Sequence, residues 1–222
     1  MEIQYHINPS SFSLQQLKNN LLSRELIPSR RSLKIDLEKR FKILEDRKIS
    51  NLLDIINTLK SKKKIEEFSV SSGISIEYLT LLRREVNSYL PNPVPLKKFP
   101  GVSVEDLDRL SEQGIKNSRN LYEKAGPKST RVALAKMVGI SLEDLEELVG
   151  MADLVRAYGV GPVFARILYD TGIHSIRELI AYSPEEIIKL YEDKFKQKAD
   201  FSLRDMKFSL EIARELHLGV EL

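Results

Sequence analysis

The sequence contains no cysteine, so disulfide bonds, thiolate metal ligands and thiol catalysis are all excluded. Its three histidines, His6, His174 and His217, lie far apart and at no spacing that is typical of metal ligands. No apolar stretch approaches the roughly 20 residues that a membrane-spanning helix needs. Residues 1–6 have neither the basic head nor the apolar run of a signal peptide. We therefore expect a cytoplasmic protein of a reducing compartment, with no membrane partner.

The sequence motifs of the common enzyme classes are missing as well. There is no Gly-x-Ser-x-Gly, no Walker pattern and no His-Glu-x-x-His. Acidic pairs such as Glu146 with Glu147 fall on helix faces that we expect to be exposed, where carboxylates usually only hold water. Catalysis would require residues from distant parts of the chain to converge. We expect no enzymatic activity, no cofactor and no metal site.

The charge that the chain does carry is unevenly distributed. Residues 1–100 hold 18 Lys and Arg against 11 Asp and Glu, whereas residues 101–222 hold 17 against 21. A basic front half can attract a polyanion such as nucleic acid, although solvated surface charge gives the same count. Interleaved aromatic residues would favour stacking on single-stranded bases, but Phe41 and Phe68 both fit core positions. The run Lys62–Lys64 also fits the solvated end of a helix, where cations complement the helix dipole.

One phrase of the sequence recurs four times at intervals of about 60 residues. It consists of an apolar residue, a serine suited to cap a helix, and apolar positions spaced for one helical face. Its four copies are Phe12–Leu17, Ile74–Leu79, Ile140–Leu145 and Phe201–Met206.

A second phrase keeps step with the first and marks a helix end and the apolar residue that follows it. Its copies are Leu44–Ile49, Leu110–Ile115 and Leu168–Ile173. We interpret the chain as three tandem helical units of about 60 residues and a C-terminal remnant. Alternating strand patterns are scarce, and the dipeptides Asn-Gly and Asp-Gly do not occur. The fold class that we predict is all-α, made of tandem helix-hairpin-helix-like repeats.

In the third unit, residues 159–161 read Gly-Val-Gly and predict a tight hairpin between two helices. Glycine on both sides lets the backbone turn with positive φ, while Val160 fills the core beneath it. Pro162 suits the first turn of the next helix. The second unit has Gly101–Ser103 at this point, but the first has Ile35–Leu37, so we expect it to lack the tight hairpin. The shared register predicts that these residues are buried: Leu110, Leu145, Leu148, Ala165, Leu168, Ile173 and Leu179.

These features together resemble a known family. Two hairpins in register, the Gly-Ile after each and the upstream Ile-Ser-Leu-Glu phrase are similar to the family of domain of unknown function 4332. The resemblance covers roughly residues 75–195 and, more faintly, the first unit. That family resembles the helix-hairpin-helix modules of DNA repair and replication proteins. The resemblance implies a fold and no established activity.

A proline-rich stretch suggests where the chain divides. Residues 90–96 read Leu-Pro-Asn-Pro-Val-Pro-Leu, which excludes a helix and favours a stiff, extended connector. We predict a basic, diverged helical part at residues 1–90 and a connector at residues 91–96. A tandem hairpin domain is predicted at residues 97–222.

The resemblance also implies where a ligand would lie. In DNA-binding relatives the hairpin amides and the next helix N-terminus face a phosphate, which the positive end of a helix dipole favours. Here the donors would be the amides of Val160, Gly161 and Val163, but Val163 and Phe164 stand where relatives usually carry a lysine. Three carboxylates within residues 104–108 follow the second hairpin and would repel a phosphate. The alternative is that both hairpins are only packing corners.

A rival motif lies at the junction of the second and third units. Residues 135–148 have the alanine, glycine and apolar spacing of a DNA-reading helix-turn-helix. Its recognition helix, residues 141–148, would expose four carboxylates, whereas a helix in the major groove needs donors and positive charge. The parallel helix of residues 75–86 carries Arg83 and Arg84. We interpret both as structural turns.

Two functions remain in competition. The first is a non-enzymatic module that binds the nucleic-acid backbone independently of sequence, through the third hairpin and the basic front half. The second is a protein-interaction or self-association module that keeps the hairpin fold without a ligand. The candidate nucleic-acid-binding residues are Gly159, Val160, Gly161, Val163, Arg166, Lys62, Lys63, Lys64, Lys97 and Lys98.

Overall fold

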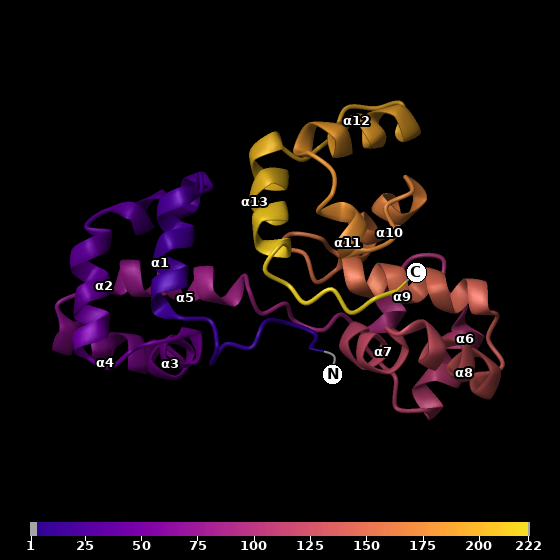
Figure 1. The fold of residues 1–222 in the computed structure, drawn as a ribbon, viewed down its shortest axis with the longest axis horizontal. Coiled ribbons are helices and arrows are strands. Elements are labelled where there is room, and N and C mark those ends of the chain that lie inside the picture. The colour runs from indigo at the N-terminus through magenta and orange to yellow at the C-terminus, as the bar shows by residue number, and fades with distance from the viewer. Residues whose placement is uncertain (1–3, 222) are drawn as a thin grey trace. The chain divides into compact units, whose positions relative to one another are not determined.

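The computed structural model describes residues 4–221, and in this part of the chain it consists of α-helices and two 3-10 segments, without a β-strand. The all-α fold class predicted from the sequence is confirmed. The described chain divides into two compact bodies (Figure 1). The N-terminal body consists of residues 7–90, and the C-terminal body consists of residues 4–6 and 91–221. None of the described helices is long and apolar enough to cross a membrane.

The N-terminal body packs its helices around a core of leucine, isoleucine and aromatic side chains. Leu17, Phe41 and Leu82 are fully buried in it. Its elements, in chain order, are α1 (Leu14–Ser23), the 3-10 segment Pro28–Lys34, α2 (Leu37–Asp46), α3 (Leu52–Thr58), α4 (Lys62–Ser72) and α5 (Ile76–Asn87).

The C-terminal body is organised around one buried helix. Its elements are the 3-10 segment Leu96–Lys98, α6 (Val104–Glu112), α7 (Ser118–Ala125), α8 (Lys128–Val138), α9 (Leu142–Leu154), α10 (Pro162–Asp170), α11 (Ile176–Leu179), α12 (Pro184–Phe195) and α13 (Leu203–Ala213). Helix α9 packs against α7, α8, α10 and α11 (Figure 1), and every residue of its second half is buried. Gly150 permits this close packing, because a Cβ atom there would lie 2.6 Å from the His174 carbonyl oxygen.

The serine of each repeated phrase caps a helix, as predicted. Ser13, Ser75, Ser141 and Ser202 each accept a hydrogen bond from the backbone amide three residues later, at the starts of α1, α5, α9 and α13. A serine oxygen at this position satisfies one of the amides that the first helical turn leaves unpaired. The same local signal therefore starts a helix in all four places.

The second phrase forms the same helix end at each of its three copies. Lys48, Gly114 and Gly172 have positive φ values of 64°, 73° and 93°. The amide of the isoleucine that follows then donates to the carbonyl five residues earlier, over 3.0 to 3.1 Å. This is the Schellman motif, whose left-handed residue is usually glycine because glycine has no Cβ to clash. The local geometry thus recurs, while the stacking of three equivalent units stays a prediction.

The corners at the hairpin positions differ between the units. Gly101 and Gly159 have φ values of 82° and 80°, and α6 and α10 each begin three residues later. Pro162 is the first residue of α10, as predicted. In the first unit the residue with positive φ is Asp36, at 50°, directly before α2. The first unit therefore turns at an aspartate with left-handed backbone geometry, directly before the helix, and not at a glycine hairpin.

The residues that the shared register places in the core are buried in the structure. None of the seven is more than 3% exposed: Leu110, Leu145, Leu148, Ala165, Leu168, Ile173 and Leu179. Burying a leucine or isoleucine side chain stabilises a fold by about 1.5–3 kcal/mol, so this set is a large part of what holds the C-terminal body together.

The proline-rich segment is extended and is attached to the C-terminal body. The carbonyl of Val94 accepts a hydrogen bond from the Ser118 amide at 2.8 Å, and the amide of Leu96 donates to the Lys116 carbonyl at 3.0 Å. The boundary between the two bodies falls before this segment. Residues 91–96 therefore belong to the C-terminal body, and not to a free connector.

Residues 4–6 also belong to the C-terminal body, which changes the division predicted at residues 1–90. Tyr5 is buried, and its hydroxyl lies 2.6 Å from the hydroxyl of Ser118. Its ring packs edge-on against Tyr122. The C-terminal body thus takes one of its core side chains from before the N-terminal body.

Two buried tyrosines should make the two bodies sensitive to alkaline pH. Burial raises the pKa of Tyr78 in the N-terminal body and of Tyr122 in the C-terminal body from 10.0 to about 12. The unfolded chain loses these protons near pH 10, so stability should fall as the pH rises from about 10 to about 12. The full loss is on the order of 3 kcal/mol per tyrosine, because one pKa unit corresponds to about 1.4 kcal/mol.

Urea unfolding followed across this pH range would measure the loss. In the Tyr78→Phe variant, the part of the pH dependence that comes from Tyr78 should disappear, because phenylalanine does not ionise. A variant with the same alkaline slope as the wild type would contradict this assignment.

Candidate nucleic-acid interface

The third hairpin forms an open corner before α10. A Cβ atom at Gly159 or Gly161 would have no neighbour within 4 Å. Val160 is buried as predicted, but its amide donates to the Ala157 carbonyl at 3.1 Å. The structure therefore does not support Val160 as a phosphate donor. The amides of Gly161 and Val163 remain as candidates, because the start of α10 offers them no helical partner.

The side chains next to this hairpin are apolar. Val163 is 61% exposed, and Phe164 packs against Phe201 with ring centres 4.8 Å apart. Neither side chain offers a charge to a phosphate. Relatives usually carry a lysine after the proline, whereas this chain has an apolar surface there. Such a surface does not attract a polyanion.

Arg166, the other predicted binding residue of this region, is engaged by two carboxylates. It pairs with Asp170 at 2.9 Å and with Glu147 of α9. The hydrogen bond with Asp170 and the charge of Glu147 raise the pKa of Arg166. Its guanidinium also lies against the second hairpin, because a Cβ atom at Gly101 would be 3.1 Å from its Nη1. Arg166 thus ties α10 to α9 and to the second hairpin, and its charge is neutralised within the body.

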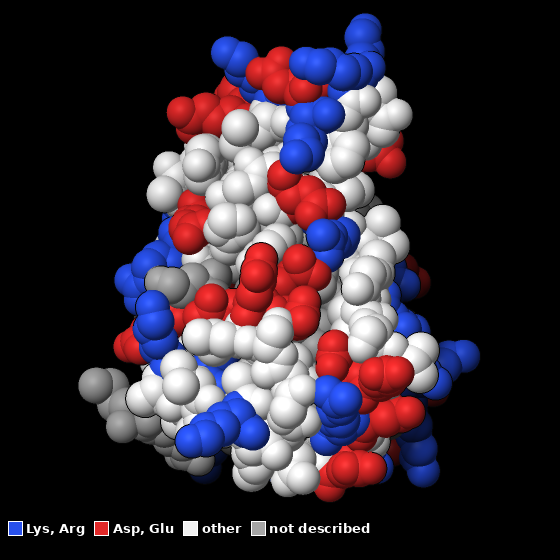
Figure 2. Space-filling model, turned by 90° about the vertical axis from the view of Figure 1, so that its right-hand side faces the viewer, with Lys and Arg blue, Asp and Glu red and all other residues white. Residues whose placement is uncertain are grey.

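The second hairpin borders an acidic pocket. This pocket, of about 140 Å³, is lined by residues 101–103, by four apolar side chains and by the carboxylates of Asp106, Asp144 and Glu147. On the face of the C-terminal body that Figure 2 shows, acidic side chains gather near the centre, and basic ones lie mostly around this group. Of the three carboxylates within residues 104–108 that are expected to repel a phosphate, Asp106 lines this pocket, and Asp144 and Glu147 of α9 add to its negative charge.

Helix α9, the recognition helix of the rival motif, is a core element. Leu145 and Leu148 are buried, and the whole second half of the helix is enclosed. Glu146 pairs with the buried Arg131 at 3.3 Å. A helix that is enclosed in this way cannot enter a DNA groove, which agrees with its interpretation as a structural turn.

Lys97 and Lys98 lie at the end of the proline-rich segment, and both are exposed. Lys97 lines an open groove of about 550 Å³ between this segment and α6. The groove also contains Asp108 and Lys116, so its charge is mixed. These two lysines are therefore accessible to a polyanion, but they do not stand in a purely basic environment.

Lys62, Lys63 and Lys64 are the first three residues of α4. They occupy the positive end of the helix dipole, and not the dipole-complementing end that the sequence analysis considered. Ser61 caps this end and accepts a hydrogen bond from the Lys64 amide at 3.2 Å, and no acidic residue lies in the first turn. The ammonium groups thus add to the partial positive charge of the helix N-terminus.

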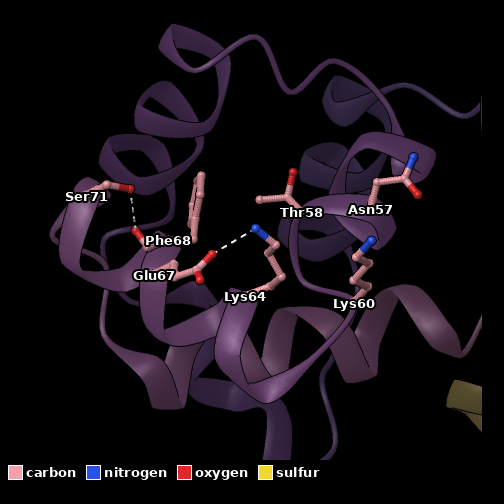
Figure 3. A pocket seen from close by; sticks show the side chains of 7 residues that line it. All are labelled: Asn57, Thr58, Lys60, Lys64, Glu67, Phe68 and Ser71. Carbon is pink, nitrogen blue, oxygen red and sulfur yellow. Dashed lines mark hydrogen bonds and ion pairs between the residues drawn. The ribbon is translucent and has the colours of Figure 1, made fainter.

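A pocket of about 420 Å³ opens beside these lysines (Figure 3). Phe68 and Lys64 rise from α4, and Thr58 faces them from the end of α3. Lys64 forms an ion pair with Glu67 at 2.8 Å, which lowers the pKa of the Glu67 carboxyl. The lining residues are Asn57, Thr58, Lys60, Lys64, Glu67, Phe68 and Ser71.

Phe68 is not the core residue that the sequence analysis expected. Phe41 is fully buried as predicted, but Phe68 is only half-buried and forms a wall of the pocket. The guanidinium of Arg47 lies 5.7 Å from the centre of the Phe68 ring and donates to the Ser71 carbonyl. The surface therefore combines an accessible aromatic ring with basic side chains. This combination was not expected from the sequence, in which Phe68 fits a core position.

Comparison with known families concerns the C-terminal body. Residues 100–204 match the model of a family described as domain of unknown function (DUF4332). These residues form a DUF4332 domain. The predicted family is confirmed, and the matched region begins at the second hairpin. No curated protein and no solved structure is significantly similar to the chain.

The DUF4332 domain contains both hairpins and the acidic pocket, whereas the pocket beside Phe68 precedes it in the chain. This second site was not predicted from the sequence, because Phe68 fits a core position. A signal was present in the spacing, since Lys64, Phe68 and Ser71 stand at positions i, i+4 and i+7 of one helix face. Only Ile65 of α4 is fully buried, which leaves that face accessible.

Proposed function

We propose that the protein is a non-enzymatic module that binds the nucleic-acid backbone without reading its sequence, and that the N-terminal end of α4 makes the main contact. The observation that carries the proposal is the run Lys62–Lys64 at the positive end of a helix, with Lys60 just before it. Phosphate is the anion that such a charge distribution attracts. A chain without cysteine suits the reducing cytoplasm, where we place this activity.

The lysines of this surface can exchange their present partners for phosphate. Lys62 lies 3.9 Å from Glu66, and Lys64 lies 2.8 Å from Glu67. Each of these four side chains is at least 47% exposed, and ion pairs of this kind contribute little because water and salt screen them. Moving an ammonium group from a screened carboxylate to a phosphate therefore costs little, and it releases counterions from the nucleic acid.

The third hairpin would supply a second, weaker contact. Its corner is open, and the amides of Gly161 and Val163 lie at the start of α10, where the helix dipole favours an anion. With Arg166 neutralised and Val163 in the place of a lysine, this contact has no cation to strengthen it.

A protein-interaction or self-association module is the second candidate function. It is favoured by apolar side chains on the surface of the DUF4332 domain, where Val104 is 72% and Met137 is 63% exposed. Val132, on the same helix as Met137, is also exposed. Exposed apolar side chains of this kind are typical of surfaces that bind another protein.

Backbone binding predicts a steep dependence on salt. We expect the affinity for a labelled oligonucleotide to fall between about 50 mM and about 200 mM salt, equally for unrelated sequences. The variant Lys62→Ala/Lys63→Ala/Lys64→Ala should bind more weakly, and its slope of log affinity against log salt should flatten by up to about 0.7–0.9 per lost contact. Fluorescence anisotropy at both salt concentrations measures the two effects.

A matched control removes three lysines from elsewhere. Lys189, Lys194 and Lys198 are exposed in or just after α12, and their replacement by alanine changes the net charge equally. If this control weakens binding as much as the α4 variant, contact is diffuse and the α4 surface is not the site. Wild-type protein that fails to bind at low salt would leave the interaction module as the function.

A further inference from the structure

We infer that the pocket beside Phe68 holds one unstacked base of a single nucleic-acid strand, with Phe68 as the stacking surface and Lys60 and Lys64 beside the flanking phosphates. The inference rests on the proposed function and narrows its ligand to single strands. It follows from the pocket itself, where an aromatic ring, two ammonium groups and three uncharged polar side chains line one space (Figure 3).

Phe68 provides a surface that every base can use. The ring is half-buried in the wall of the pocket, so one part of it is fixed by the protein and another is accessible. The guanidinium of Arg47 lies 5.7 Å from the ring centre and donates to the Ser71 carbonyl, which adds a further positive charge near the ring. Stacking on an aromatic side chain is tolerant of sequence, because each base has a π face.

The remaining lining residues suit the edge of a base and its phosphates. Asn57 carries both a donor and an acceptor, and the Thr58 hydroxyl can do either. The Ser71 hydroxyl donates to the Phe68 carbonyl at 3.1 Å, so toward a base it can act as an acceptor. Lys60 and Lys64 supply positive charge at the rim. Glu67, paired with Lys64 at 2.8 Å, is the one carboxylate of the lining, and it disfavours a phosphate deep in the pocket. The phosphates are therefore placed at the lysines and the base at Phe68.

The size of the pocket agrees with a single base. Its volume of about 420 Å³ lies at the lower end of the range of about 300–1,000 Å³ that is usual for small-ligand sites. A base in a duplex cannot enter such a pocket unless it leaves its stack and its partner, which costs free energy. In a single strand the bases are already unpaired, so most of this free-energy cost is absent. The protein should therefore bind single strands more tightly than duplexes.

The experiment compares an oligothymidylate strand, an abasic strand of equal length and a duplex, each labelled and measured by fluorescence anisotropy at low salt. Phe68→Leu should weaken binding of the oligothymidylate by about 5- to 150-fold, the effect of losing one stacked base. The affinity for the abasic strand should not change, because lysines bind its phosphates. Phe68→Tyr should restore binding, since tyrosine keeps the stacking surface.

The matched control is Phe195→Leu, the same substitution at a partly exposed phenylalanine of α12, which should change none of the three affinities. Should Phe68→Leu fail to fold, Asn57→Ala, at an exposed pocket position, replaces it. It should weaken binding of the oligothymidylate through lost contacts to the base edge, and it should not change the affinity for the abasic strand. Equal loss on the abasic strand, or no loss on either, overturns the base pocket while lysine-dependent binding still supports the proposed function. Free thymidine monophosphate that competes as well as the strand would make this a mononucleotide site and overturn the inference. Absence of all binding by the wild type overturns the proposed function itself.

Discussion

Replacing Arg156 with methionine should destabilise the C-terminal body by about 3–5 kcal/mol, because it leaves a buried carboxylate without its cation. Arg156 is fully buried and pairs with Asp153, whose carboxylate also accepts the Ile176 amide at 2.7 Å. The guanidinium further donates to the carbonyls of Tyr5 at 2.8 Å and His217 at 2.7 Å. A domain is typically stable by about 5–15 kcal/mol in total, so the loss should be visible in urea unfolding followed by circular dichroism.

Arg177→Met is the control for this experiment. The guanidinium of Arg177 donates to the Leu218 carbonyl at 3.2 Å, but this side chain is exposed, so water can replace the contact. Its unfolding midpoint should stay close to that of the wild type. Equal midpoints for both variants would show that the buried pair contributes nothing net.

Replacing Glu85 with alanine should destabilise the N-terminal body by a similar amount, about 3–5 kcal/mol. Glu85 is fully buried between Arg24, at 2.6 Å, and Arg30. Its removal leaves two guanidinium groups in a largely buried site with no carboxylate between them. Hydrogen exchange followed by mass spectrometry should show faster exchange in residues 7–90, because this cluster lies wholly within that body.

A compensated variant separates the two causes of this effect. Arg24→Met/Glu85→Leu/Arg30→Met removes all three charges, and apolar side chains of similar volume often replace a buried ion network without loss. It should therefore recover most of the stability that Glu85→Ala loses. If the compensated variant exchanges as fast as the single one, the loss comes from packing and not from unpaired charge.

The parts of the fold that the sequence predicts are those that depend on near neighbours. A serine before an apolar turn caps a helix whatever surrounds it, which is why Ser13 and Ser141 behave as predicted. Gly114 and Gly172 end helices because only their own backbone geometry is involved. The buried positions follow from helical periodicity, which is also local.

The parts that the sequence does not predict depend on residues that are distant in the chain. Arg166 has the right type and place for a phosphate ligand, but Glu147 of another helix neutralises it. Phe68 has an apolar spacing typical of a core, yet no neighbouring element covers it fully. Tyr5 belongs to the C-terminal core, where its carbonyl accepts a hydrogen bond from Arg156. Nothing in the first residues of the chain indicates this contact. The positive charge of the sequence therefore indicates the candidate lysines, whereas the pocket beside them is found only in the tertiary structure.

The attachment of Tyr5 makes the C-terminal body a discontinuous domain, interrupted in sequence by a complete contiguous one. The N-terminal body has all its residues once residue 90 has been synthesised, and its helices can pack at that moment. The C-terminal body needs Tyr5, from the very start of the described chain, together with the His217 carbonyl from its end, and Arg156 joins them. Closing such long loops costs entropy before any contact is gained. We expect the N-terminal body to fold first and quickly, and the C-terminal body to fold late, after synthesis has reached its last helix.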